Sequence, residues 1–400
     1  MPNSIRNRIK DFLKNNKIAY DLYYYTFSFL LSIVGRLIPM KRNRVLFVCY
    51  GGKQYDDSPR VIFEAMIKDK EFNNCQFIWA FEDPSKFEIE RGTKLKIDSI
   101  KYFFYAMSSK VWISNSAVER GLKFKNPNTF FLNTWHGTPI KKIGRDSHSA
   151  NKTSGFGSKD VNSQNIMLAQ SQYESEIFTK LFDIKEGGIV VCGLPRNDEL
   201  HLADDEAKKE TRKKLGIPAD KTVILYAPTY REYERDQYDS CVFTSPIDFL
   251  KWERQLGETH YVIYRTHYEV KLDSCFNSNS FIVDYSSYPK INDLMIASDI
   301  LISDYSSIFV DYSILGKPMI AFPYDYKTYE EKRGLYKDIY DLFAFPICTS
   351  VEELFNVIVN IDEKEVINTV EAFHNNYYDS EGNATSTVLG ILHNILNEAR

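Results

Sequence analysis

Several features that mark well-known protein classes are missing from this sequence of 400 residues. The six cysteines lie far apart and form neither a C-x-x-C pair nor a Cys/His cluster, so the sequence predicts no disulfide framework and no zinc site. No G-x-G-x-x-G fingerprint is present, and Gly51-Gly52-Lys53 is too short to be a Walker loop. The net charge of −4 argues against generic nucleic-acid binding, which normally requires a concentrated basic footprint. These absences favour a reduced cytosolic chain that does not bind nucleic acid.

The amino-terminal region also lacks an apolar run that is long enough to cross a bilayer, which takes about 20 residues. Its longest run, residues 22–34, stops at Gly35-Arg36. Tyrosines at positions 20 and 23–25 lie beside basic residues, and tyrosine favours the interface between membrane and water. We therefore expect this run to lie in a membrane surface.

The first 44 residues carry nine basic side chains against two acidic ones, a local excess of seven positive charges. A helix here would place one apolar stripe opposite a basic face, which is typical of interfacial membrane helices. We expect residues 1–42 to attach the protein peripherally to the cytoplasmic face of the cell membrane, an anionic surface. A cleaved signal peptide fits less well because no small-residue cleavage site follows the apolar run, whereas a helical extension packed on the core stays open. The stripe consists of Ile5, Ile9, Phe12 and Leu13.

From residue 43 onward, short apolar runs alternate with helical segments, which predicts an α/β fold with parallel, doubly wound sheets. We expect two Rossmann-like domains that face a ligand cleft, residues 43–197 and 198–400, with the last helix crossing back to the first domain. Expected strands are 44–49, 77–80, 111–114, 130–134, 167–169 and 189–192, then 222–229, 261–267, 281–283, 300–303 and 319–322. Expected helices of the first half are 58–66, with Ser58 as the N-cap, 99–108 and 172–182.

The turn at Trp135-His136-Gly137 follows an apolar, strand-like run. Gly137 and Pro139 end that strand, so His136 is expected at a strand's carboxyl end, where open α/β sheets bind ligands. A hydrogen-bonded structural histidine is the alternative. The polar stretch 145–164 follows this turn, and a loop of that length either closes over substrate or is disordered.

Two further strand ends carry residues suited to anions. Gly193-Leu-Pro-Arg-Asn-Asp198 presents Arg196 on a turn fixed by proline, although an exposed linker arginine is the alternative. In Ile302 to Pro318, a buried strand leads into Ser306 and Ser307 at a helix start, where free N–H groups favour a phosphate. Asp311 lies one turn beyond Ser307 and can accept hydrogen bonds from ligand hydroxyls. Helix capping alone would also explain the serines.

Five motifs, each at an expected strand end, resemble the CDP-glycerol glycerophosphotransferase family, the wall teichoic acid primases and polymerases of Gram-positive bacteria. The resemblance runs from about Arg44 to the carboxyl end, and Gly51 to Arg60 is similar to the family's first strand, loop and helix. The stretch from Arg145 to His148 has no clear counterpart, which leaves the acceptor open. The motifs are Trp135-His-Gly-Thr-Pro139, Gly193-Leu-Pro-Arg-Asn-Asp198, Ala227-Pro-Thr229, Arg265-Thr-His267 and Ser303-Asp-Tyr-Ser-Ser-Ile-Phe-Val-Asp311.

The resemblance implies a GT-B fold and transfer of an alditol phosphate from CDP-glycerol or CDP-ribitol to a hydroxyl of a lipid-linked or polymeric acceptor, with CMP released. Glycerol phosphate is the first choice. The implied catalytic residues are His136, as the base, and His267. The implied donor-binding residues are Gly137, Thr138, Pro139, Ile140, Arg196, Pro228, Thr229, Arg265, Thr266, Ser306, Ser307 and Asp311.

Two other functions stay open at this point. A GT-B glycosyltransferase that uses a UDP- or GDP-sugar would share the fold, because fold alone does not fix function. A non-catalytic membrane scaffold would use the cleft only to hold an anionic polymer. No cofactor is expected, and Mg²⁺ on Asp304 and Asp311 is the alternative.

Overall fold

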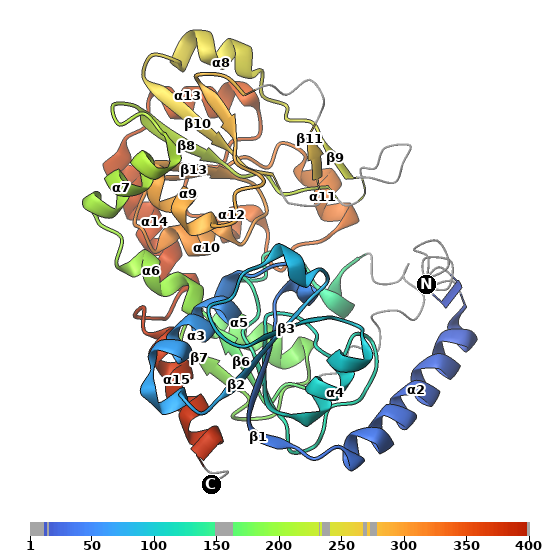
Figure 1. Cartoon of the computed structure of the whole chain (residues 1–400). Helices are drawn as coiled ribbons and strands as arrows, with labels where there is room; N and C mark the ends of the chain where they lie inside the picture. Colours follow the sequence, from blue (N-terminus) through green and yellow to red (C-terminus); the bar gives the residue numbers. More distant parts are fainter. Residues whose placement is uncertain are drawn as a thin grey trace. The chain divides into compact units, whose positions relative to one another are not determined.

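The structure is a computed structural model that describes residues 12–13, 16–148, 163–231, 233, 241–266, 270–272 and 278–397. The chain divides into two compact units. The first comprises Met1–His136, Ile143–Asp198 and Asp379–Arg400, and the second comprises Gly137–Lys142 and Glu199–Tyr378. Each unit is built around one parallel sheet, as Figure 1 shows.

The sheet of the first unit has seven strands in the order β3-β2-β1-β4-β5-β6-β7, and every neighbouring pair is parallel. The order runs outward from β1 in both directions, which is the doubly wound arrangement. The strands are β1 (Lys41–Val48), β2 (Gln76–Phe81), β3 (Thr93–Lys96), β4 (Ser109–Ser114), β5 (Phe130–Asn133), β6 (Ile166–Ala169) and β7 (Ile189–Val191).

Helices cover both faces of this sheet. Along β1, Val45 and Phe47 point into one apolar cluster and Leu46 and Val48 into another, as the two-residue period of a strand dictates. The first cluster includes residues of α3 and α15, and the second includes residues of α4. The helices of this unit are α2 (Lys17–Leu37), α3 (Asp57–Lys68), α4 (Ile100–Ser108), α5 (Gln172–Leu181) and α15 (Ala384–Asn397), with short 3₁₀ turns η1 (Tyr50–Gly52), η4 (Gly144–Asp146) and η6 (Pro195–Asn197).

The second unit has a five-stranded parallel sheet in the order β12-β10-β8-β13-β14 and a two-stranded pair, β11-β9. Its strands are β8 (Thr222–Tyr226), β9 (Cys241–Phe243), β10 (His260–Tyr264), β11 (Val270–Leu272), β12 (Ile282–Asp284), β13 (Ile300–Ser303) and β14 (Met319–Ala321). Its helices are α7 (Asp205–Leu215), α8 (Phe249–Leu256), α9 (Ile291–Ala297), α10 (Ile308–Ser313), α11 (Tyr326–Lys332), α12 (Ile339–Leu342), α13 (Val351–Val359) and α14 (Glu363–Tyr377), while α6 (Asp198–His201) joins the units.

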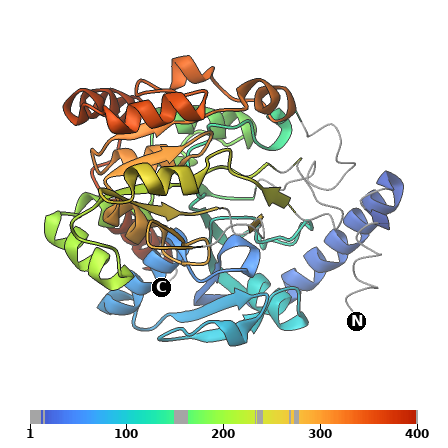
Figure 2. The ribbon, with the colours of Figure 1, turned by 90° about the horizontal axis from the view of Figure 1, so that it is seen from above.

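The amino-terminal helix α2 has two different faces. Tyr20, Tyr24, Ser28 and Gly35 are buried on one stripe, which packs beside α4. The rest of the helix exposes large apolar side chains, and α2 lies at the edge of the first unit in both Figure 1 and Figure 2. No helix among the described residues is long and apolar enough to cross a membrane. Half of the predicted stripe lies outside the described residues, which include Phe12 and Leu13 but not Ile5 or Ile9.

Several predicted boundaries differ from the structure. Helix α3 begins at Asp57, so the prediction that Ser58 is its N-cap is wrong. Asp57 takes over part of that task, because its own carboxylate accepts the Ser58 N–H at 2.5 Å. The strands predicted at 222–229 and 261–267 end at Tyr226 and Tyr264, because the N–H groups of Thr229 and Thr266 donate to side chains and not to a neighbouring strand. The polar strand β3 was not predicted.

Candidate active site

Polar side chains gather where the strands of the first sheet end. Tyr50 follows β1, Asn115 follows β4, His136 lies three residues after β5, and Arg196 lies in η6 after β7. Asp57 begins α3, the helix that follows β1. The carboxyl edge of an open parallel sheet is where such folds bind ligands, so this edge is the candidate active site of the first unit.

The imidazole of His136 is held by a backbone carbonyl. Its Nδ1 lies 2.8 Å from the carbonyl oxygen of Asn115. A carbonyl oxygen can only accept a hydrogen bond, so Nδ1 carries the proton and the lone pair of a neutral ring lies on Nε2. Ring contacts fix the plane of the imidazole, since Trp135 stacks on it with centroids 4.4 Å apart and Tyr50 lies at 5.8 Å.

Backbone conformations that side chains rarely adopt occur at several positions around this histidine. Trp135 has φ 53°, Gly137 has φ 141°, Tyr50 has φ 45° and Asp57 has φ 59°. Non-glycine residues in the left-handed region store strain of order 1–3 kcal/mol each and tend to occur at functional sites. This concentration of strain supports the assignment of the site.

The carboxylate of Asp57 is the centre of the hydrogen bonds at this edge. It accepts from the Tyr50 hydroxyl at 2.5 Å, from Asn115 Nδ2 at 3.2 Å and from Arg196 Nη1 at 3.2 Å. Asn115 in turn accepts from the Tyr50 N–H at 2.8 Å through Oδ1. Asn115 therefore links the carboxylate, through its side chain, to His136, through its backbone carbonyl.

Two pKa shifts follow from this arrangement. Burial alone would raise the pKa of Asp57, but the Arg196 cation and the donors Tyr50 and Ser58 outweigh it and hold that pKa below its usual value. His136 contributes in the same direction. Burial and the negative charge of Asp57 raise the pKa of Tyr50 well above its usual value. Asp57 is therefore an anion and Tyr50 a neutral hydrogen-bond donor at neutral pH.

The motif Gly193 to Asp198 has a clear structural task. The ion pair of Arg196 with Asp57 is largely buried, with 12% and 2% of the two side chains exposed. Asn197 Nδ2 donates to Gln170 Oε1 at 2.7 Å. Asp198 accepts from the first two N–H groups of α15, at 3.0 and 2.7 Å, and so caps that helix. Donor binding by Arg196 stays a prediction alongside this role.

The residues that follow His136 cluster with the second unit. Lys141 forms an antiparallel bridge with Leu335, and the Ile140 carbonyl accepts the Tyr336 N–H at 3.0 Å. Thr138 and Ile140 are buried there, at 2% and 3% exposure. The glycine and proline of this turn thus end β5 and lead the chain into the second unit.

In the second unit, the strand ends of β8 and β13 are joined by Asp304. Its Oδ1 accepts from the Thr229 N–H at 2.9 Å and from the Tyr305 N–H at 2.7 Å. Pro228 and Thr229 are buried, and the Thr229 hydroxyl has no hydrogen-bond partner among the described residues. A buried polar atom without a partner costs about 1–3 kcal/mol, so this hydroxyl is a candidate for contact with a ligand.

The buried Arg231 side chain links these turns to one another. Its side chain is fully buried, donates to Asp304 Oδ2 at 2.9 Å and pairs with both oxygens of Asp325 at 2.8 Å. The rings of Tyr305, Tyr324 and Tyr329 surround it at 5.1–5.3 Å from the guanidinium carbon. Although burial lowers its pKa, the two carboxylates raise that pKa above its usual value, so Arg231 stays charged. It fixes the ends of β8, β13 and β14 relative to one another.

The predicted phosphate turn begins α10 as expected, with Ser307 at the N-cap position. Helix α10 begins after Ser307, but the Ser307 side chain makes no capping hydrogen bond, and it is Ser306 Oγ that accepts the Ile308 N–H at 3.3 Å. Ser306 and Ser307 are partly exposed, whereas Asp311 is 4% exposed. Because α10 has only six residues, its dipole is short, and its contribution to anion binding is correspondingly limited.

The predicted residues after β10 are anchored to the turn that follows β12. Arg265 Nη1 donates to the carbonyls of Tyr285 and Tyr288, at 3.1 and 2.5 Å. The N–H of Thr266 donates to Ser286 Oγ at 2.9 Å. The predicted catalytic residue His267 lies outside the described residues.

Within the described part of the chain, no group of three or more His, Cys, Asp and Glu side chains could hold a metal ion. Of the two acids considered for Mg²⁺, Asp304 already binds Arg231 and two backbone N–H groups. The sequence reasoning missed Tyr50, Asp57, Asn115 and Arg231. Asp57 and Arg231 lie inside or next to motifs that had been recognised, Gly51 to Arg60 and Ala227 to Thr229, which is the signal that would have found them.

Comparison with known proteins adds the following. The chain matches the family CDP-Glycerol:Poly(glycerophosphate) glycerophosphotransferase over residues 30–394. It is 31% identical over 375 residues to the teichoic acid poly(glycerol phosphate) polymerase of Staphylococcus epidermidis, which covers 90% of this chain and 52% of that protein. It is 30% identical over 399 residues to the teichoic acid glycerol-phosphate transferase of Staphylococcus aureus, which covers 96% and 97%. The chain thus spans about half the length of the first relative and nearly all of the second.

Solved structures agree with these matches. A structure of the wall teichoic acid polymerase TagF has a TM-score of 0.83 at 30% identity and covers 92% of this chain and 93% of that chain. A TagF variant soaked with CDPG has the same TM-score. S. aureus MnaA with UDP, at 12% identity and a TM-score of 0.53, shares the fold alone. The α/β fold with parallel sheets is therefore of the GT-B-like kind.

Proposed function

This chain belongs to the CDP-glycerol:poly(glycerophosphate) glycerophosphotransferase family, and from this premise we propose that it transfers glycerol phosphate from CDP-glycerol to a hydroxyl of a teichoic acid acceptor. The observation that carries the mechanism is the hydrogen bond from His136 Nδ1 to the Asn115 carbonyl, which puts the basic lone pair on Nε2. The relatives named above act on glycerol phosphate in teichoic acid, which supports this substrate class.

The proposed reaction is an in-line displacement at the phosphorus that carries the glycerol. The acceptor oxygen forms a bond to that phosphorus, the bond to the oxygen shared with the other phosphate breaks, and CMP leaves with the electron pair. His136 Nε2 takes the proton of the attacking hydroxyl. Phosphoryl transfer depends mostly on alignment and charge neutralisation, so no covalent intermediate is needed.

In the proposed mechanism, the first unit contributes the general base, His136. Asp57 is an anion, and its negative charge favours the imidazolium that forms when His136 takes a proton, while Arg196 opposes this effect. Asn115 and Tyr50 fix the geometry through the hydrogen bonds described above. They act as positioning residues for His136.

We assign donor binding to the second unit. The buried Thr229 hydroxyl has no partner among the described residues, and Ser306 and Ser307 are partly exposed on the turn that Asp304 joins to Thr229. Arg265 would supply positive charge and N–H donors to the pyrophosphate. Thr266, whose N–H binds Ser286, would position this turn. CDP-ribitol is the other donor that would suit these groups.

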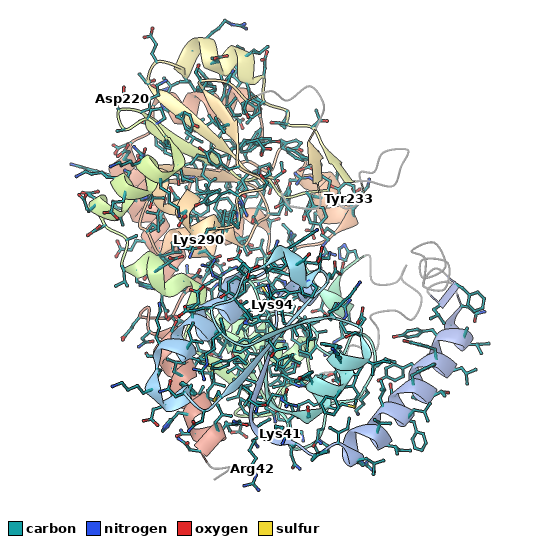
Figure 3. The ribbon with its side chains drawn as sticks, viewed as in Figure 1. Lys41, Arg42, Lys94, Asp220, Tyr233 and Lys290 are labelled. Atoms are coloured by element: carbon teal, nitrogen blue, oxygen red, sulfur yellow. The ribbon has the colours of Figure 1, made fainter. Side chains whose placement is uncertain are left out.

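We also propose that the protein works on the cytoplasmic face of the cell membrane and that its acceptor is lipid-linked. The support is the exposed apolar face of α2, together with basic residues at its end. Lys41 and Arg42 are exposed where the chain leaves α2 for β1, and Figure 3 shows them at the edge of the first unit. Apolar and basic side chains in one segment suit an anionic membrane surface.

A nucleotide-release assay tests the activity. Purified protein is incubated with CDP-glycerol, CDP-ribitol or UDP-sugars, in the presence of a lipid-linked acceptor. CMP release from CDP-glycerol and a new phosphodiester signal in the phosphorus NMR spectrum are the expected results. Release of UDP with a glycosidic product would overturn the proposal in favour of a glycosyltransferase, and no release with any donor would point to a non-catalytic scaffold.

A further inference from the structure

A cavity of about 510 Å³ lies in the first unit at the edge opposite His136. Its walls come from the segments that lead into three neighbouring strands: residues 123–127 before β5, 163–165 before β6, and 182–188 before β7. His136, in contrast, lies beyond the carboxyl end of β5. The cavity is therefore separate from the candidate active site.

The wall of this cavity carries an excess of cations. Lys123, Lys125 and Lys185 line it, and no carboxylate of the described residues forms an ion pair with any of the three. One of the two acids in the wall, Asp183, is already paired with Arg145 at 2.9 Å. The other acid, Glu186, is exposed.

Lys125 is the most informative of these cations. Its Nζ donates to Asn165 Oδ1 at 2.9 Å. Burial lowers the pKa of Lys125, and the carboxylate of Glu119, which accepts the Lys125 backbone N–H at 2.8 Å, only partly opposes this effect. A partly desolvated ammonium group that lacks a counter-ion gains stability when an anion binds beside it.

Asn165 adds a second kind of donor. Its Oδ1 accepts from both Lys125 Nζ and the Phe131 N–H, at 2.9 and 2.8 Å. Because the oxygen faces those two groups, the amide nitrogen faces the other way, with two N–H donors. The polar part of the wall thus presents ammonium and amide donors, beside the apolar side chains of Phe182, Ile184 and Pro127.

The same wall is fastened to α2. The Lys123 N–H donates to Ser28 Oγ at 2.9 Å, and Ser32 Oγ donates to the Lys123 carbonyl at 3.3 Å. Asn126 Nδ2 donates to the Gly35 carbonyl at 3.5 Å. The segment that carries Lys123 and Lys125 is therefore attached to the buried side of α2, the helix whose other side is the exposed apolar face.

We propose that this cavity binds the phosphodiester headgroup of an anionic glycerophospholipid. Lys125, Lys123 and the Asn165 amide hold the phosphate oxygens, and the apolar side chains contact the glycerol. The connection to α2 favours a lipid over a soluble phosphate as the source. The source of the ligand rests on the membrane attachment proposed above, whereas the preference for a phosphodiester rests on the cavity alone.

Lysine labelling tests the proposal on the full chain. The protein is treated with a small amine-acylating reagent in the presence of vesicles of phosphatidylglycerol or of phosphatidylcholine, and modification of each lysine is read by mass spectrometry. We expect phosphatidylglycerol to protect Lys125 about fivefold more than phosphatidylcholine, the effect of about one basic contact with an anionic surface. Lys213, exposed on the second unit, is the internal control and should show no such difference. Equal labelling of Lys125 with both lipids overturns the proposal.

Soluble ligands separate the possible sources. Glycerophosphoglycerol, the free headgroup, should protect Lys125 at millimolar concentration, and Asn165→Asp should abolish this protection because it replaces the amide donors by a carboxylate. A thermal melt verifies that this variant is folded, and Lys213→Gln serves as the charge-matched control for Lys125→Gln in vesicle binding. If soluble poly(glycerol phosphate) protects Lys125 better than the vesicles do, the site is for polymer and the lipid assignment is wrong.

The two proposals fail in distinguishable ways. Nucleotide release from CDP-glycerol in detergent reports on the transferase, and Lys125→Gln should leave it unchanged. Loss of lipid-specific protection with normal nucleotide release would overturn only the headgroup site.

Discussion

At the scale of single residues, the proposed mechanism depends on the protonation state of His136. Its Nδ1 is committed to a carbonyl, so only Nε2 can accept a proton. His136→Ala should lower kcat by about 10²- to 10⁴-fold, as the loss of a general base does, while the Kd of CDP-glycerol changes little. Stopped assays for kcat and equilibrium binding for Kd measure the two quantities. His393→Ala, which removes a histidine from α15 in the same unit, should leave both unchanged. A near-normal kcat for His136→Ala at saturating substrates would make His136 a structural turn residue.

The charges around His136 predict how activity depends on pH. Asp57 and His136 stabilise each other's charged forms, and His136 helps to hold the pKa of Asp57 below its usual value. A base must be neutral, so kcat should fall on acidification as His136 takes up a proton; an unperturbed imidazole has a pKa of about 6.5. Asp57→Asn should move this fall to lower pH, and Arg196→Gln should move it to higher pH.

The two variants test this prediction because they should shift the pH at which kcat falls in opposite directions. Cys49, Asp56 and Tyr50 also face this cluster, but none of them is altered in either variant. A variant that only loosened the fold would lower kcat at every pH without moving the midpoint. Shifts in the same direction for both variants would mean that Asp57 and Arg196 do not act on His136 through their charge.

Some residues of the candidate site could be predicted from the sequence and others could not, for a physical reason. His136 stands out because glycine and proline mark a turn directly after an apolar run. Asp57 and Asn115 do not stand out, because their importance depends on contacts between chain segments that are distant in sequence, such as the one between Asn115 and His136. Hydrogen bonds of this kind become visible only when the strand order is known.

At the scale of elements, Asp304 and Arg231 link the turns after β8 and β13, so these turns have little conformational freedom. The Thr229 hydroxyl is the buried polar atom there without a partner among the described residues. Thr229→Val keeps the shape and removes that hydroxyl, so it should leave stability unchanged or raise it slightly. If the hydroxyl binds the donor, the same change should raise the Kd of CDP-glycerol about five- to tenfold, the value of one hydrogen bond. Thermal melts and titration with CDP-glycerol measure both effects.

Ser307→Ala is the matched comparison for this prediction. Ser307 makes no capping hydrogen bond, so its loss should cost less stability than the roughly 1 kcal/mol of a lost cap. A weaker affinity for the donor with normal stability would support contact between Ser307 and the phosphate. An unchanged Kd for CDP-glycerol in both variants would mean that this turn does not bind the donor.

At the scale of the whole molecule, the alternation of strands and helices predicted most of the two parallel sheets. Runs such as Val45–Val48 are apolar on every residue because helices cover both faces of each sheet, and this signal is strong. The edge strand β3 was missed because its sequence Thr-Lys-Leu-Lys is mostly polar, as edge strands often are. The three-residue strands β9 and β11, which pair with each other among the described residues, were not predicted either.

Membrane attachment is the prediction that involves the whole molecule, because α2 joins an apolar surface to the unit that carries His136. Ile18, Leu22, Phe29 and Leu37 are 82%, 69%, 66% and 78% exposed, which is unusual for large apolar side chains on one helix. Deletion of residues 1–42 should therefore reduce sedimentation with anionic vesicles.

A finer change separates this face from the buried stripe and keeps the fold. Replacing Leu22, Phe29 and Leu37 by serine should weaken binding to vesicles by roughly 100-fold, even if each side chain is only partly buried in the lipid. Added salt should weaken vesicle binding of the native protein, because salt screens its basic residues. Salt should not remove the difference in binding between the native protein and the serine variant. Tyr24→Phe, on the buried stripe, should bind vesicles normally. If the serine variant and the truncated protein sediment as well as the native chain, the exposed face of α2 is not a membrane anchor, and another partner must cover it.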